Sequence, residues 1–171
     1  MAEAAGRAHP TGVDRRPGPR LAVRAVILWR GRLLLVNAWP GEISDLWAAP
    51  GGGAEAGASL PDNLVREVGE ETGLSVEVGA PCLVNEFHDP ASGFHQVEVF
   101  FRCRLSAGAA PSAAGAAPPG GWPDPEEVVT RRRWVTRAEI AGLRVKPDSL
   151  PRIAWSAGGL AYDPLEPLQR Q

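Results

Sequence analysis

The segment from Ser59 to Leu74 constrains the fold more than any other part of the chain, because it marks a helix at both ends. Ser59 is a residue type that accepts hydrogen bonds from the free amides of a first helical turn, and Pro61 is tolerated in that turn. Gly73 can adopt the left-handed conformation that ends a helix, and Leu74 supplies the apolar contact that usually accompanies it. The sequence therefore predicts a helix over Leu60–Thr72.

Three carboxylates lie on one side of this predicted helix, namely Glu67, Glu70 and Glu71. At about 100° per residue they share an arc of about 100°, beside the apolar arc of Leu64, Val68 and Val65 that would face a core. Like charges at this spacing repel by roughly a few tenths of a kcal/mol per pair. An acidic face that only meets solvent is the common outcome. Hard oxygen ligands at a core edge also suit Mg²⁺ or Mn²⁺, so the helix alone leaves both interpretations open.

A glycine-rich turn, Pro50-Gly51-Gly52-Gly53, precedes the helix. Without side chains, its carbonyls and amides are open to close approach by a ligand. A divalent ion held by carboxylates usually takes further ligands from water and substrate phosphates. No Gly-Lys-Ser/Thr follows the turn, so it is not a P-loop. Carboxylate cluster and glycine turn together indicate phosphate chemistry.

These residues resemble the box of the Nudix hydrolase (MutT-like) family. That box reads Gly, five residues, Glu, seven residues, Arg-Glu, apolar, any residue, Glu-Glu, any residue, Gly, apolar. Here it begins at Gly52 and ends with residues 66–74, which read Arg-Glu-Val-Gly-Glu-Glu-Thr-Gly-Leu. Each fixed position matches except the first Glu, where this chain has Ala58. The resemblance covers roughly residues 20–155.

The resemblance implies an α/β (α+β) fold, an α/β/α sandwich around a mixed β-sheet with the box as a loop–helix–loop metal site. It implies an enzyme that uses Mg²⁺ or Mn²⁺ to hydrolyse the diphosphate linkage of a nucleoside diphosphate derivative or nucleoside triphosphate, by attack of water at phosphorus. The implied partner is a small-molecule nucleotide or diphosphate substrate. Many family members dimerise, so a homodimer comes into consideration, although no interface pattern is visible.

The resemblance also implies roles for individual residues. Glu67 and Glu71 would be the principal metal ligands, and the carbonyl near Gly52 a further one. Glu70 would be a third ligand or the base for the attacking water, so that all three glutamates are catalytic candidates. Arg66 would pair with these glutamates and orient them without touching the substrate.

Two positions leave alternatives open. Many members of the family carry another acidic residue before the last strand, and Glu126 or Glu127 would occupy that place here unless the pair is a plain surface turn. The Glu missing at Ala58 usually braces the loop through Arg66, so its loss should loosen the loop or leave Arg66 to Glu70 alone, and should lower catalytic efficiency more than abolish catalysis. Ala58 also motivates an alternative function, a nucleotide-binding or regulatory module with weakened or lost hydrolysis.

A few other residues are candidates for substrate binding. Trp39, in a loop, could stack on a base or cover a core edge, while His88 and His95 flank a turn and either reach the substrate or lie at the surface. Cys82 and Cys103 have no evident base beside them and are better explained as small core residues than as nucleophiles.

Apolar and β-branched runs predict strands on both sides of the acidic helix. The predicted strands are 21–29, 32–38, 81–87, 95–105 and 128–135, with a hairpin turn at Arg30-Gly31 and short helices at 137–143 and 147–155. Within 95–105, alternation of Val97, Val99 and Phe101 with more polar neighbours predicts burial mainly on one face.

Composition sets the domain limits. At 171 residues the chain is expected to hold one domain, residues 21–155. Residues 1–20 are expected to form a disordered tail, 156–171 a C-terminal tail, and 107–121, where every residue except Ser112 is Ala, Gly or Pro, a flexible insert.

Charge and hydropathy exclude some classes of partner. A formal net charge of −2, from 18 Lys and Arg against 20 Asp and Glu, argues against a general nucleic-acid binder. The longest apolar runs fall far short of the ~20 residues that span a bilayer, and the first residues show no secretory signal. We therefore expect a cytoplasmic protein without a membrane partner.

Overall fold

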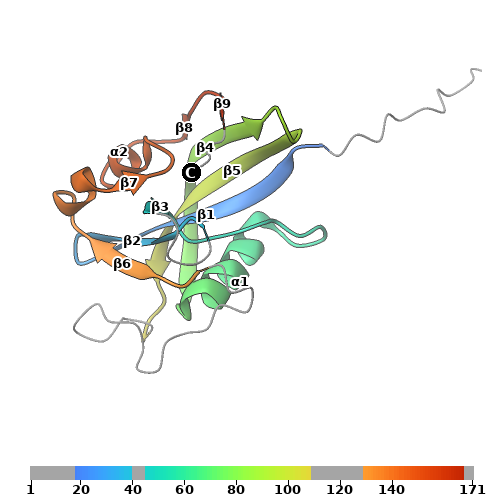
Figure 1. Cartoon of the computed structure of the whole chain (residues 1–171). Coiled ribbons are helices and arrows are strands. Elements are labelled where there is room, and N and C mark those ends of the chain that lie inside the picture. Colours follow the sequence, from blue (N-terminus) through green and yellow to red (C-terminus); the bar gives the residue numbers. More distant parts are fainter. Residues whose placement is uncertain (1–17, 40–44, 109–128, 168–171) are drawn as a thin grey trace, which may run out of the picture.

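Strand β1 (Arg20–Trp29) runs through the centre of the computed structural model, which describes residues 18–39, 45–108 and 129–167 (Figure 1). The described strands form one curled mixed sheet in the order β7-β3-β2-β1-β5-β4-β8, with β6 beside β2 and β9 beside β4. Their bounds are β2 Arg32–Asn37, β3 Leu46–Ala48, β4 Val76–Asp89, β5 Phe94–Leu105, β6 Arg132–Val135, β7 Arg144–Val145, β8 Ala161–Tyr162 and β9 Glu166–Pro167. The helices are α1 Leu60–Thr72, the 3₁₀ turn η1 Glu139–Gly142 and α2 Leu150–Ala154.

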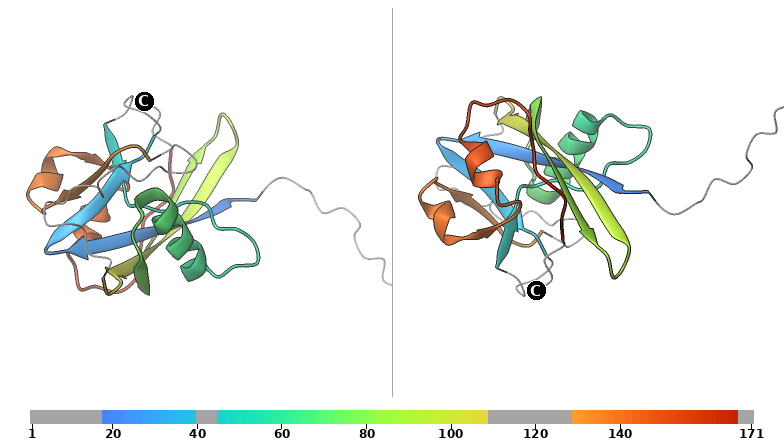
Figure 2. Two further views of the ribbon diagram at one scale, coloured as in Figure 1. Left: turned by 90° about the horizontal axis from the view of Figure 1, so that it is seen from below. Right: turned by 90° about the horizontal axis from the view of Figure 1, so that it is seen from above.

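The two helices cover opposite faces of the sheet, as the views in Figures 1 and 2 show. Alternate residues of β1 point to opposite faces. Val23, Ala25 and Ile27 pack in one buried cluster with residues of α1, whereas Val26 packs in a second cluster with residues of α2. One central strand therefore supplies both hydrophobic cores, and the predicted arrangement of helices around a mixed sheet is confirmed.

Helix α1 begins and ends where the sequence predicts, but Val65, predicted to face the core, is 42% exposed. The Ser59 hydroxyl accepts the amide of Asp62 at 3.2 Å, and Gly73 has φ 68° with its amide donating to Gly69 O at 2.8 Å. Arg132 of β6 adds a long-range contact, because its Nη1 donates to Thr72 O at 2.9 Å. A cation at the negative end of a helix is favourable, so β6 holds the end of α1 in place.

The hairpin between β1 and β2 is also confirmed. Arg30 and Gly31 both have positive φ, 49° and 76°, as a two-residue turn with the twist of a hairpin requires. Across the turn, Leu28 pairs with Leu33 in antiparallel register.

Strand β5 differs from the prediction in which of its faces is more buried. Gln96 and Glu98 are 3% and 5% exposed, whereas Val97 and Val99 are half-buried, so the polar residues and not the valines lie on the more buried face of this half of the strand. The predicted strand 128–135 is shorter, Arg132–Val135, and the predicted helices are reduced to η1 and α2.

The segment after residue 156, expected to be a tail, packs against the sheet. Its strands β8 and β9 pair in parallel with β4, and Lys146 Nζ contacts Glu166 Oε2 at 3.1 Å. Most of the predicted N-terminal tail and of the 107–121 insert lies outside the described residues, and those predictions stand as they were made.

Both cysteines are core residues in the structure. Cys82 and Cys103 are 1% and 5% exposed. Burial raises the pKa of the Cys103 thiol to about 12, so it stays protonated and unreactive at neutral pH. No helix among the described residues is both long and apolar enough to cross a bilayer.

Candidate active site

The glycine turn is tied to β1 through its backbone. The amide of Ala25 donates to Pro50 O at 2.8 Å and the amide of Val23 to Gly52 O at 2.9 Å, and the pairing continues at Ala54. The turn therefore lies alongside the central strand rather than projecting as a loose loop.

A Cβ would overlap neighbouring atoms at two positions of this turn. Gly51 has φ 135°, a conformation that favours glycine, and a Cβ there would overlap the carbonyl oxygen of Val23. A Cβ at Gly52 would overlap Glu67 Oε2. The turn thus meets β1 on one side and a helix carboxylate on the other.

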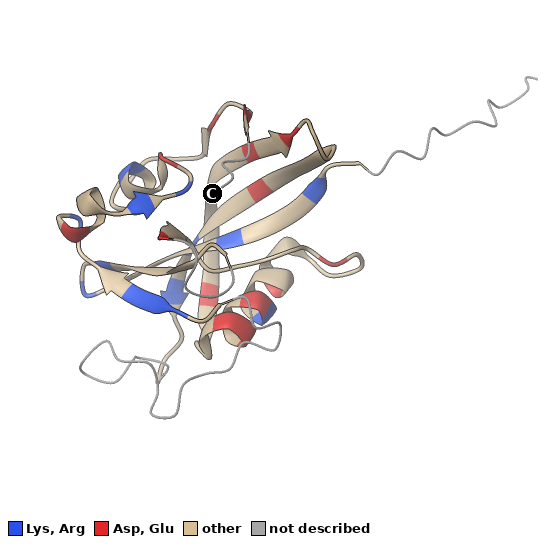
Figure 3. Cartoon of the chain, in the orientation of Figure 1, with Lys and Arg blue, Asp and Glu red and all other residues tan. Residues whose placement is uncertain are grey.

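The three helix carboxylates lie in the second half of α1, and Figure 3 shows acidic residues close together on this helix. Glu71 Oε2 accepts the amide of Gly51 at 2.7 Å. The Glu67 side chain, 15% exposed, lies against Gly52, while Glu70 is 41% exposed. Two carboxylates therefore face the turn and the third faces solvent.

Arg66 balances part of this negative charge. Its Nη2 contacts Glu67 Oε1 and its Nη1 contacts Glu70 Oε2, both at 2.8 Å. Desolvation alone would lower the pKa of Arg66, but the charges of Glu67 and Glu70 outweigh it and raise that pKa. The arrangement holds two carboxylates that would otherwise repel each other.

Arg24 of β1 connects the turn with a second group of polar residues. Its Nη1 donates to Gly51 O, and its Nε contacts Glu98 Oε1 at 2.8 Å. Burial would lower its pKa, but the charges of Glu98 and Glu71 raise it above its ordinary value.

A divalent cation would find hard oxygen ligands here, of the kind that such ions prefer. Glu67 and Glu71 face the turn, and the Gly52 carbonyl keeps a second lone pair beside its bond to Val23. In the described part of the chain, no three His, Cys, Asp or Glu side chains converge on one point that would enclose a metal ion. The oxygen atoms of these residues suit a divalent cation as ligands. The cation would have to compete with Arg66 and the Gly51 amide for the carboxylates.

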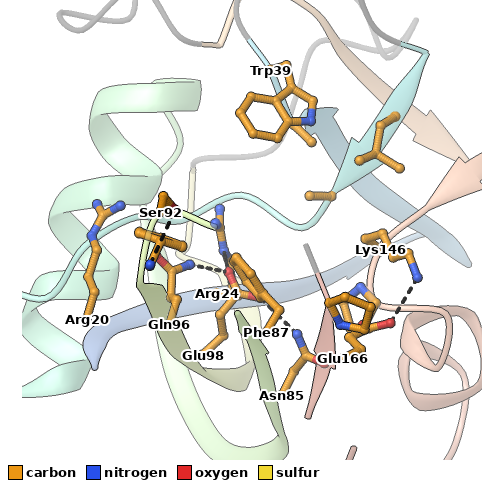
Figure 4. Close-up of a pocket in the computed structure, with 16 residues that line it drawn as sticks. Arg20, Arg24, Trp39, Asn85, Phe87, Ser92, Gln96, Glu98, Lys146 and Glu166 are labelled. Carbon is orange, nitrogen blue, oxygen red and sulfur yellow. Dashed lines mark hydrogen bonds and ion pairs between the residues drawn. The ribbon is translucent and has the colours of Figure 1, made fainter. Parts of the chain in front are cut away.

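A cavity of about 450 Å³ opens beside this group, on the α2 face of the sheet (Figure 4). Its walls come from β1, the two residues after β2, β3, β4, β5, the two residues after β7, and β9. Trp39 is part of this wall, and its stacking on a base stays a prediction. His88 and His95 are not among its lining residues; they pair across β4 and β5, where His95 Nε2 contacts Glu86 at 3.3 Å.

Comparison with known families shows which family the chain belongs to. The model of the NUDIX domain matches residues 18–155. The chain belongs to the Nudix family. A putative ADP-ribose pyrophosphatase from Bacillus subtilis is 30% identical over 95 residues, which cover 54% of this chain and 44% of the relative. This chain spans less than half the length of the curated relatives it matches.

Solved structures agree on the Nudix fold. A NUDIX hydrolase from Nitrosomonas europaea has a TM-score of 0.62 at 20% identity, over 91% of this chain and 81% of that one. A UDP-X diphosphatase has a TM-score of 0.58 at 22% identity, over 90% of this chain and 70% of the other.

The Nudix box of this chain is braced without a carboxylate at Ala58. Glu55 Oε1 lies 3.6 Å from Arg66. Asn63, which is 1% exposed, accepts the amide of Glu55 at 2.9 Å and Arg66 Nη2 at 3.3 Å, and donates to Ser59 O at 3.0 Å. The loop is therefore tied to the helix by a buried amide, and the expectation that it is loosened finds no support in these contacts.

Sequence reasoning missed three polar residues of the cavity. Asn85, Gln96 and Glu98 interrupt apolar strands, and simple alternation assigns Glu98 to solvent. A carboxylate that is buried beside two carboxamides can be recognised only once the register of β4 on β5 is known, since Asn85 pairs with Glu98 in that register. Glu126 and Glu127 lie outside the described residues.

The fit of the Nudix turn against β1 can be tested by denaturation. Gly51→Ala should lower the free energy of unfolding by at least about 2 kcal/mol, because the new Cβ meets backbone and the φ is unfavourable. Gly69→Ala, inside α1 with open space around it, is the control and should raise that free energy by about 0.5–1 kcal/mol. Equal effects of the two substitutions would contradict the tight contact.

Proposed function

We propose that this chain is a metal-dependent hydrolase that cleaves the diphosphate linkage of a nucleoside diphosphate derivative or a nucleoside triphosphate. The observation that carries the proposal is the contact between carboxylates and a side-chain-free turn, with Glu71 on the Gly51 amide and Glu67 against Gly52. The related pyrophosphatase from Bacillus subtilis supports the same class of substrate, a nucleotide joined to another group through a diphosphate.

Mg²⁺ or Mn²⁺ would be held by Glu67, Glu71 and the Gly52 carbonyl. Such an ion neutralises diphosphate charge and lowers the pKa of a bound water. Glu70 serves as a third ligand or as the base that takes a proton from the attacking water. Its exposure leaves it open to water, and Arg66 holds one of its oxygens at 2.8 Å, which orients the carboxylate for either role.

Two arginines of β1 would position the substrate between the turn and the cavity. Arg24 bonds the turn at Gly51 O and lines the cavity, and the guanidinium of Arg20 packs against Gly53 and lines it as well. Charge-assisted hydrogen bonds to diphosphate oxygens are strong and directional. The base or other attached group would then enter the cavity while the diphosphate stays at the carboxylates.

Several expectations from the sequence belong to this proposal without a structural observation of their own. They are an additional acid at Glu126 or Glu127, a cytoplasmic location, a homodimer, and the absence of nucleic-acid and membrane partners.

The proposal is tested by incubating the protein and Mg²⁺ with 8-oxo-dGTP, ADP-ribose, NADH, dinucleoside polyphosphates and CTP, followed by phosphatase-coupled phosphate release. At least one substrate should be hydrolysed, and a chelator should abolish the reaction. Glu71→Gln and Glu67→Gln should lower kcat by about 10²-fold or more, because each removes a charged oxygen ligand. Glu77→Gln, at an exposed position on β4, is the control and should leave kcat unchanged. Hydrolysis that survives in both site variants would contradict the assigned site.

The second candidate function is a nucleotide-binding or regulatory module, and Ala58 is the observation that favours it. Because Arg66 already contacts Glu67, Glu70 and Asn63, we expect Ala58→Glu to change kcat/KM by less than about fivefold, the scale of one exposed ion pair. A tenfold rise would show that the missing carboxylate limits the rate. A chain that binds these nucleotides but turns over none, with or without Ala58→Glu, would be the binding module.

A further inference from the structure

Unpartnered polar atoms concentrate in the wall of the cavity. Among the described residues, four buried side-chain nitrogen or oxygen atoms have no hydrogen-bond partner. Three of the four, Trp39 Nε1, Asn85 Oδ1 and Gln96 Oε1, belong to residues that line this one cavity. A buried polar group without a partner is costly and rare in a folded protein. Their concentration at one place indicates a ligand that supplies the missing partners.

One carboxylate determines which way the two amides point. Asn85 Nδ2 donates to Glu98 Oε2 at 3.4 Å, and Gln96 Nε2 donates to Glu98 Oε1 at 3.0 Å (Figure 4). Glu98 also contacts Arg24, so it carries a charge and can only accept hydrogen bonds. Turning either amide over would set its oxygen against the carboxylate. The carbonyl oxygens of Asn85 and Gln96 are therefore held on the side away from Glu98 as acceptors.

The rest of the wall suits a flat ring. Phe87 and Phe94 face each other across β4 and β5 with ring centroids 5.9 Å apart, and both line the cavity, as does Trp39. Aromatic side chains stack on nucleobases. Trp39 Nε1 can donate to a ring nitrogen or carbonyl oxygen of the same ligand. A volume of about 450 Å³ is adequate for a base and part of its sugar.

We propose that the cavity receives a nucleobase with an exocyclic amino group, whose N–H groups donate to Asn85 Oδ1 and Gln96 Oε1. This assignment rests on the proposed function, because it places the base of the substrate beside the turn at which the diphosphate is proposed to bind. Arg24 contacts that turn and also lines the cavity. Adenine, cytosine and guanine carry such an amino group. At that edge uracil and thymine present one ring N–H between two carbonyl oxygens, and hypoxanthine presents one ring N–H beside a single carbonyl oxygen, so each would set a carbonyl oxygen against an acceptor. The specificity of the site is thus for amino-bearing over amino-free bases.

The test measures binding of nucleoside monophosphates to the full chain by calorimetry, without metal, so that hydrolysis plays no part. In the matched pairs AMP and IMP, and CMP and UMP, a carbonyl oxygen replaces the amino group and the neighbouring ring nitrogen gains a hydrogen, whereas GMP and IMP differ only by the amino group. Each amino-bearing nucleotide that binds should do so at least about tenfold more tightly than its partner, because a base without the amino group leaves buried acceptors unpaired. Equal affinities within every pair, or no binding of any amino-bearing nucleotide, would overturn the assignment.

Variants identify the residues responsible. Gln96→Leu should reduce the preference within a pair to about threefold or less, with Asn85→Leu as a second variant should the first fail to fold. Glu86→Gln is the matched control, since Glu86 follows Asn85 on β4, points to the opposite face and should leave the preference unchanged. A preference that survives both cavity variants in folded protein would overturn the assignment.

The outcomes separate this inference from the proposed function. Preference for amino-bearing nucleotides in a chain that hydrolyses nothing would overturn the hydrolase and support the base site. Hydrolysis of a diphosphate substrate with no preference between paired nucleotides would support the hydrolase and overturn the base site.

Discussion

The backbone pairing of the glycine turn with β1 is the contact on which the rest of the site depends. Hydrogen bonds from Val23 and Ala25 hold the turn against the central strand, and a side chain at Gly51 would overlap the backbone of that strand. The same strand supplies apolar residues to both cores. Any movement of the turn would therefore disturb the packing of α1, and the carboxylates are placed as accurately as the core itself.

Charge is distributed so that a cluster of carboxylates can exist at the edge of a core. Arg66 engages Glu67 and Glu70, and Arg24 lies close enough to Glu71 and Glu98 for their charges to raise its pKa. Arg24 also joins the turn to Glu98, which in turn orients the carboxamides of the cavity. One half-buried guanidinium thus connects the proposed metal site with the proposed base site.

Local signals in the sequence were sufficient to predict α1, because Ser59, Pro61 and Gly73 act within one turn of the helix ends that they mark. They also predicted the β1–β2 hairpin, since Arg30 and Gly31 complete it without help from distant residues. The carboxylates followed from helical periodicity, and the family followed from the box around them.

Features that depend on distant pairings were not predictable from local pattern. Strands β3 and β7 have only three and two residues. They form because β3 pairs with β2 and β7 pairs with β3. The wall of the cavity depends on the register of β4 on β5. That pairing places Glu98 on a buried face, although its more polar character than Val97 and Val99 predicts exposure to solvent. Asn63 replaces the brace expected at residue 58 only because the loop folds back over it, and the chain after residue 156 forms strands only because the edge of β4 is available.

The central claim is that the turn and the α1 carboxylates together form a binding site for a divalent cation. The most direct measurement is a titration of the full chain with Mn²⁺, followed by the loss of the free-ion signal in electron paramagnetic resonance. The account predicts saturable binding that Glu67→Gln weakens by tenfold or more, the scale expected when a charged oxygen ligand is lost. Binding of equal affinity in the folded Glu67→Gln variant, or no binding by the unaltered chain, would contradict it.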